Sequence, residues 1–158
     1  MILSHVIRRA TLGVGLACAV AVAAPAASSP ARALARPGVS VDVRPLLDNS
    51  GEPTASWVAQ ALPGAIAEAM AASGQGGTTV SVRSDYVILG PNTGGVGPAG
   101  SSPDQMIGEV TRGGVTQPLR ATNYYYPMAQ DNVMIAQSNH DRVVRLAQAF
   151  AGWVARGY

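Results

Sequence analysis

The stretch that decides the fold is "NHDRVVRLAQAFAGWVARG", residues 139–157. Placed on a helical wheel, it separates into an apolar face and a polar face. The apolar face holds Val143, Leu146, Ala147, Phe150, Trp153 and Val154, and the polar face holds Arg142, Arg145, Gln148 and Arg156. Ser138 is predicted to be the N-cap of this helix, with Asp141 three residues later as its capping-box-like partner. The C-terminal stretch therefore predicts an amphipathic helix that can cover one face of a sheet.

A second amphipathic helix is predicted in "TASWVAQALPGAIAEAMAASG", residues 54–74. Its apolar side chains recur at helical spacing: Val58, Leu62, Ala65, Ile66 and Ala69. Pro63 removes one backbone donor and clashes with the preceding turn, at a cost of about 3 kcal/mol. We therefore expect a kink or a split at Pro63, and we expect both tryptophans, Trp57 and Trp153, to anchor their helices on the sheet.

Alternating sequence predicts two strands before and after this helix. In "VSVDVRP", residues 39–45, Val39, Val41 and Val43 alternate with polar residues. The following "LLDNSGEP" is turn-like. In "TTVSVRSDYVILG", residues 78–90, the alternation places Val80, Val82, Tyr86 and Ile88 on one face and Arg83, Asp85 and Val87 on the other.

A β-hairpin is predicted between residues 106–112 and 115–126, because Gly113 and Gly114 can supply the positive φ angles of a tight turn. Pro118 cannot donate to a strand ladder, so the last strand is either an edge strand there or begins after it. The predicted order is β-α-β-β-β-α. It indicates an α+β two-layer sandwich, with a four-stranded, mostly antiparallel sheet covered on one face by two helices.

The N-terminus is typical of a signal peptide: basic "MILSHVIRR" precedes apolar "ATLGVGLACAVAVAAPA". Cleavage is expected after Ala26 or Ala35, with 1–35 as the preferred leader and 36–158 as one small domain, periplasmic or secreted. Two alternatives stay open, namely a lipid anchor on Cys18 and a retained N-terminal anchor. We expect no membrane span once the leader is removed.

Charge and composition argue against several classes of ligand. Without residues 1–35 the chain keeps eight arginines and nine carboxylates, a net charge near −1, so it lacks the basic face that nucleic-acid binding needs. The Gly/Pro-rich segment 90–105 resembles a phosphate-binding loop, but the chain has no lysine, and prolines and a predicted strand follow Gly90 where a phosphate site would need a helix N-terminus, so we interpret it as an inter-strand loop with no nucleotide. The carboxylates are scattered, so no metal site and no cofactor are predicted.

"NYYYP", residues 123–127, supplies the candidate binding residues Tyr124 and Tyr126, because an exposed tyrosine offers a flat apolar face with a polar tip. No catalytic residue is predicted. A hydrolase would need His140 and a carboxylate to meet Ser56, Ser84 or Ser138, and neighbouring His140 and Asp141 point about 100° apart on a helix.

"VSVDVRP" with the helix after it, and the strand-hairpin-helix finish, resemble small envelope modules of Gram-negative bacteria over residues 38–157. The resemblance is to the lipopolysaccharide-assembly lipoprotein family and to the α/β domain of lipoproteins that activate penicillin-binding proteins. It implies a non-catalytic, exported envelope protein that binds a protein or glycan partner, as an assembly accessory. A small periplasmic hydrolase and a self-associating structural protein are the alternatives.

Overall fold

The computed structural model describes residues 38–91, 103–124 and 135–157. The predicted leader with Cys18, the middle of the Gly/Pro-rich segment, and Tyr126 lie outside these ranges. The elements, in chain order, are β1 (Val39–Asp42), α1 (Arg44–Ser50), α2 (Thr54–Ala72), β2 (Val80–Ile88), β3 (Asp104–Arg112), β4 (Val115–Asn123) and α3 (Ile135–Arg156).

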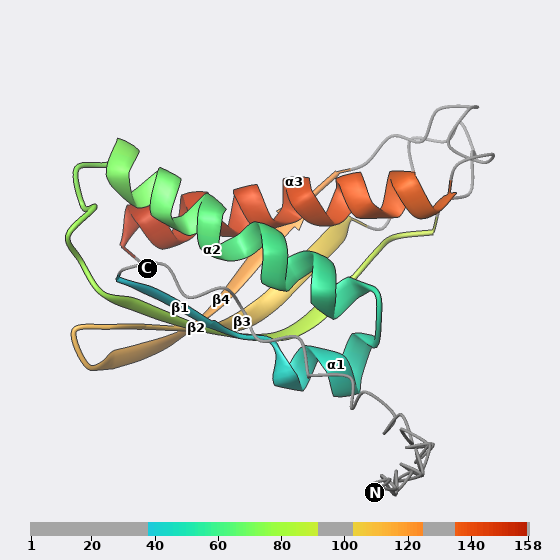
Figure 1. Ribbon diagram of the computed structural model, residues 1–158, viewed down its shortest axis with the longest axis horizontal. Helices are drawn as coiled ribbons and strands as arrows, with labels where there is room; N and C mark the ends of the chain where they lie inside the picture. The colour runs from blue at the N-terminus through green and yellow to red at the C-terminus, as the bar shows by residue number, and fades with distance from the viewer. Residues whose placement is uncertain (1–37, 92–102, 125–134, 158) are drawn as a thin grey trace, which may run out of the picture.

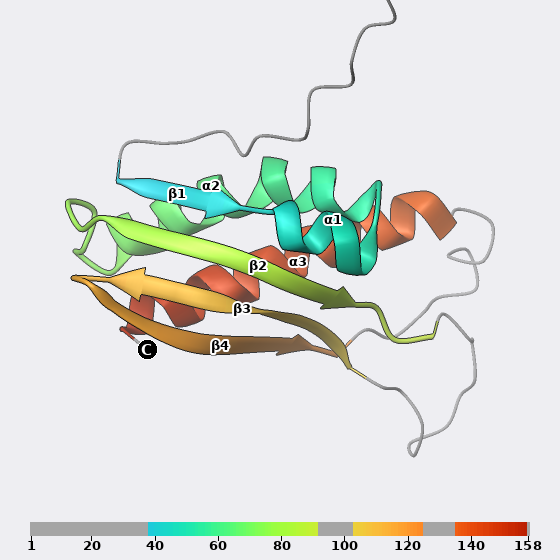
Figure 2. The same ribbon diagram turned by 90° about the horizontal axis from the view of Figure 1, so that it is seen from below.

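The four strands form one sheet in the order β1-β2-β3-β4. β1 pairs with β2 in parallel, because α2 carries the chain back between them, and the other two pairings are antiparallel. Gly113 and Gly114 form the tight turn between β3 and β4, with φ angles of 58° and 81°. The predicted α+β sandwich with a mostly antiparallel sheet is confirmed (Figures 1 and 2).

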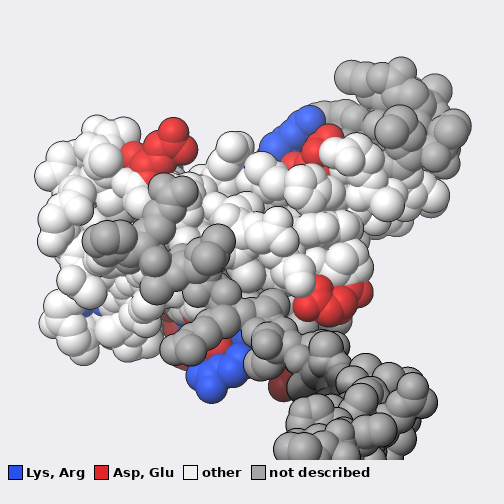
Figure 3. All heavy atoms as spheres, in the orientation of Figure 1, with Lys and Arg blue, Asp and Glu red and all other residues white. Residues whose placement is uncertain are grey.

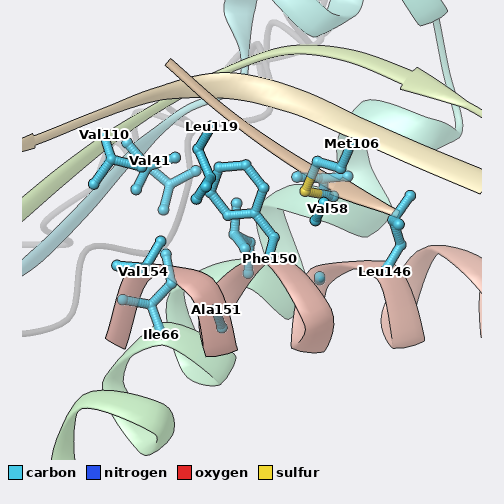
Figure 4. Close-up of a cluster of buried hydrophobic side chains, with 14 of the residues drawn as sticks. Val41, Val58, Ile66, Met106, Val110, Leu119, Leu146, Phe150, Ala151 and Val154 are labelled. Carbon is cyan, nitrogen blue, oxygen red and sulfur yellow. The ribbon is translucent and has the colours of Figure 1, made fainter. Parts of the chain in front are cut away.

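Helices α2 and α3 lie on the same face of the sheet and run parallel to each other (Figure 1). Trp57 and His140 meet near their N-terminal ends, and the Gln75 side chain donates to the Ala155 carbonyl near their C-terminal ends. Phe150 is fully buried between the helices and the sheet, where Leu119 and Val110 reach it from the strands (Figure 4). The apolar helix faces predicted from sequence therefore do form the core.

A polar clasp fixes the C-terminal ends of both helices to the sheet. Arg112, the last residue of β3, donates to the side-chain oxygen of Gln75 at 2.7 Å and to the Val154 carbonyl at 2.6 Å. The sulfur of Met70 lies 3.1 Å from the same guanidinium. One side chain thus satisfies acceptors near the ends of both helices, where carbonyls lack intrahelical partners. On the face of the molecule seen in Figure 3, most side chains are uncharged and the charged ones lie at separate points.

Three local predictions about the helices are wrong. Residues 44–50, expected as strand end and turn, form the short helix α1, with Pro45 in its first turn, where the missing donor costs nothing. Of the two alternatives at Pro63, the split is wrong, because α2 continues through this residue and burial of its apolar face outweighs the lost backbone bond, while the kink stays a prediction. α3 already includes Ile135, so Ser138 is an interior, buried residue and cannot be the N-cap.

Candidate functional site

The two helices leave the other face of the sheet uncovered by any described element (Figure 2). We call this the outer face. Its central residues, which alternate with buried ones along β2, β3 and β4, are Arg83, Tyr86, Ile88, Gln105, Ile107, Glu109, Pro118, Arg120 and Thr122. It is the broadest surface on which this fold can present side chains from several strands at once.

A β-bulge decides which side chains β2 contributes to the outer face. The register with β3 shifts between Ser84 and Tyr86, so Asp85 is an extra residue on β2. The shift reverses the alternation, and Tyr86 and Ile88 become 45% and 48% exposed while Val87 is buried. The predicted face assignment of these three residues is therefore wrong, because strict alternation fails after an inserted residue.

Gly108 on β3 makes the bulge sterically possible. A Cβ atom there would lie 2.3 Å from the backbone oxygen of Arg83, which is too close for any side chain. The bulge also leaves the Ser84 hydroxyl buried with no hydrogen-bond partner among the described residues, a cost of about 1–3 kcal/mol. A glycine inside a strand is the one sequence signal that could have predicted this bulge.

Each side of the sheet carries features that hinder strand addition, and the edge strand β1 is only four residues long. Beyond the end of β1, α1 caps the edge of β2: Asn49 donates to the Asp85 carbonyl at 2.9 Å, and the Ser50 hydroxyl bonds with the backbone of Val87. On the other side β4 is an edge strand from Val115 onward, which confirms the first alternative predicted from Pro118. Pro118 breaks the row of edge donors there. A short edge strand, a covering segment and a proline in an edge strand are all features that protect sheet edges.

The charges of the outer face lie beside its apolar residues. Arg83 contacts Asp85 at 3.1 Å and Glu109 at 3.4 Å, so its charge is shared between two carboxylates. Arg120, on β4, lies opposite Ile107 of β3. It is exposed and has no acidic partner among the described residues. At the end of β1, hydrogen bonds from the Arg44 guanidinium hold the pKa of Asp42 below its ordinary value.

Of the two predicted binding residues, Tyr124 is described and is 63% exposed, immediately after β4. Tyr126 lies outside the described residues. Tyr86, which sequence alternation assigned to the core side, is the additional exposed tyrosine on the sheet.

His140 is not brought to a serine hydroxyl in the described part of the chain. Its ring packs edge-to-face on Trp57 at 5.4 Å, and its Nδ1 lies 3.4 Å from Asp141 Oδ1, so the two neighbours do approach each other, contrary to the sequence argument. Ser56 instead donates to Glu52 at 2.9 Å, and the Ser84 hydroxyl is the unpaired one beside the bulge. Ser138 lies two residues before His140 on α3, a spacing at which helical side chains do not face each other.

A buried ion pair lies where the Gly/Pro-rich segment leaves and rejoins the fold. Asp104 accepts from Arg142 through both carboxylate oxygens and from the Gly90 amide at 2.9 Å, and Arg142 also donates to the Gly90 carbonyl at 2.6 Å. Arg142 is 2% exposed, so its predicted place on the polar face of the helix is wrong. The pair holds residue 90 against the start of β3 and against α3.

In the part of the chain that the structure describes, no group of three His, Cys, Asp or Glu side chains could hold a metal ion. None of the described helices has the length and apolar character to cross a membrane. No protein-family model, curated protein or solved structure matches the chain. The resemblance to envelope lipoproteins thus stays a prediction.

Proposed function

We propose that this protein is an exported, non-catalytic binding protein of the bacterial cell envelope, and that it docks a partner protein on the outer face of its sheet. The bulge in β2 carries the proposal. It turns Tyr86 and Ile88 outward at the cost of a glycine in β3 and a buried hydroxyl left unpaired among the described residues. Bulges that re-aim side chains in this way are frequent beside functional surfaces.

The outer face is favoured over the other surfaces on physical grounds. Strand addition is disfavoured because the edge strand β1 has only four residues, α1 covers β2 beyond it, and Pro118 lacks a backbone donor in the other edge strand. A protein partner is favoured over a glycan because Tyr86 adjoins two isoleucines, Ile88 and Ile107, and such mixed aromatic and aliphatic clusters suit the core of a protein interface. The resemblance to envelope-assembly lipoproteins makes an accessory role in assembly the specific form of this proposal.

Site-specific photocrosslinking in the native host tests the proposal. A benzophenone amino acid replaces Tyr86, and the matched control carries it in place of Glu68, which is exposed on α2 in the other layer. We expect a discrete protein adduct from position 86 that is absent from position 68 and is lost when Ile107→Glu is added. An adduct with glycan alone, equal labelling from both positions, or no adduct from position 86 would contradict the proposal.

A further inference from the structure

We propose that the partner on the outer face is a second copy of this chain, packed face to face about a two-fold axis. The inference rests on the proposed function, in which the outer face is a docking surface. It starts from two neighbouring rows of residues across β2, β3 and β4. The register places Arg83, Glu109 and Pro118 in one row and Tyr86, Ile107 and Arg120 in the next.

These two rows are complementary to each other. Consider a two-fold axis parallel to the sheet, perpendicular to the strands and lying between the rows. Rotation about this axis places the first row of one copy against the second row of the other copy. Each strand then faces the same strand of the other copy, as a self-complementary contact requires. Arg83 then lies over the ring of Tyr86 of the second copy, a cation–π arrangement. Each such contact occurs twice, because the axis relates both copies in the same way.

The same operation supplies Arg120 with an acidic partner. Arg120 faces Pro118 of the second copy, and Glu109 of that copy lies opposite Pro118 on the adjacent strand. The guanidinium therefore reaches the carboxylate across one strand spacing of about 4.8 Å. Glu109 would lie between Arg83 of its own chain and Arg120 of the other. Arg120 and Glu109 thus each gain a charge partner, with no like charges brought together.

The size of the face indicates a weak dimer. β2, β3 and β4 have nine residues each and span about 30 Å, and β1 has four and spans about 13 Å, so at about 4.8 Å per strand the footprint is roughly 500 Å² per copy. The total of about 1,000 Å² falls at the lower limit for specific protein interfaces. We therefore expect a reversible dimer with a dissociation constant on the order of micromolar.

Sedimentation velocity of the exported chain, purified as the host processes it, tests the inference over a concentration series. Two charge reversals are compared, Arg120→Glu and Glu109→Arg, with Arg145→Glu on the exposed side of α3 as the matched control. Each reversal alone places like charges in contact twice and should weaken the dimer about tenfold or more. The control should dimerise like the native chain.

An equimolar mixture of the two reversed variants is the decisive sample. In the mixed dimer, one contact pairs the negative charge now at position 120 of one copy with the positive charge now at position 109 of the other. The second contact pairs the native Arg120 with the native Glu109. Both ion pairs are therefore restored, and dimerisation should return. A monomer at every concentration, a dimer insensitive to both reversals, or a mixture that stays monomeric would overturn the inference. If the protein is a monomer and position 86 still forms an adduct with another protein, the inference that the partner is a second copy would be overturned. The proposed docking function would then stand.

Discussion

Loss of the Asp104 carboxylate should destabilise the protein more than any surface change. The carboxylate accepts from Arg142 and from the Gly90 amide, and it is fully buried. Asp104→Ala removes the carboxylate that faces the buried Arg142 guanidinium, and breaking such a buried ion pair costs about 3–5 kcal/mol. For a domain of this size the loss corresponds to a fall in melting temperature of roughly 10–20 °C. Urea unfolding followed by tryptophan fluorescence measures the change in the free energy of unfolding.

The double variant Asp104→Leu/Arg142→Met separates the cost of an unpaired charge from the net value of the pair. Apolar replacements of similar volume often recover stability, because no charge then has to leave water. Gly90 loses partners for its amide and carbonyl, so we expect the double variant to be more stable than Asp104→Ala but less stable than the native protein. A single variant that costs less than about 1 kcal/mol, or a double variant that equals the sum of the single changes, would refute this reasoning.

Three further changes have definite expected outcomes. Gly108→Ala should destabilise by about 1–3 kcal/mol in urea unfolding, because its Cβ would lie 2.3 Å from a backbone oxygen, whereas Gly152→Ala, with no atom within 4 Å, should be neutral or stabilising. Arg112→Leu should lower hydrogen-exchange protection at the C-terminal end of α3, and unchanged protection would show that the clasp is dispensable. Arg44→Gln should raise the NMR-measured pKa of Asp42 toward its ordinary value of 3.8. In the native protein the pair stabilises the fold above pH 3.8, and this stabilisation is lost as the pH falls through the lowered pKa of folded Asp42. A pKa that does not move in the variant would contradict the assignment.

The layers of the fold could be predicted because they depend on periodicity alone. Apolar residues at helical spacing identified α2 and α3, and alternation identified β1 and β2. The Gly113-Gly114 turn joined β3 to β4 as expected, since only positive φ angles close so tight a hairpin. Strand order and the parallel pairing of β1 depend on where α2 lands on the sheet, and local sequence does not contain that information.

The errors arose where a tertiary contact overrides the local pattern. Alternation assigned Tyr86 to the core side because the sequence of β2 contains no signal for the extra residue of the bulge. The signal is Gly108, which lies on the neighbouring strand. The helical wheel assigned Arg142 to the solvent-exposed face because a wheel represents one helix alone and does not include the contact with Asp104 of β3. Both errors concern pairs of residues that are distant in sequence.

The same distant contacts explain why the outer face is the surface to test first. An edge strand with free backbone donors binds strands of any sequence, and this sheet limits such binding through the short strand β1, the Ser50 contact with Val87 of β2, and Pro118 in β4. A face selects by side chain, since shape and charge must match across several strands. The bulge changes only the face, by turning Tyr86 outward beside Ile107. The proposed docking function would account for a glycine at the centre of the sheet and for a buried hydroxyl that no described residue pairs, since both features cost stability.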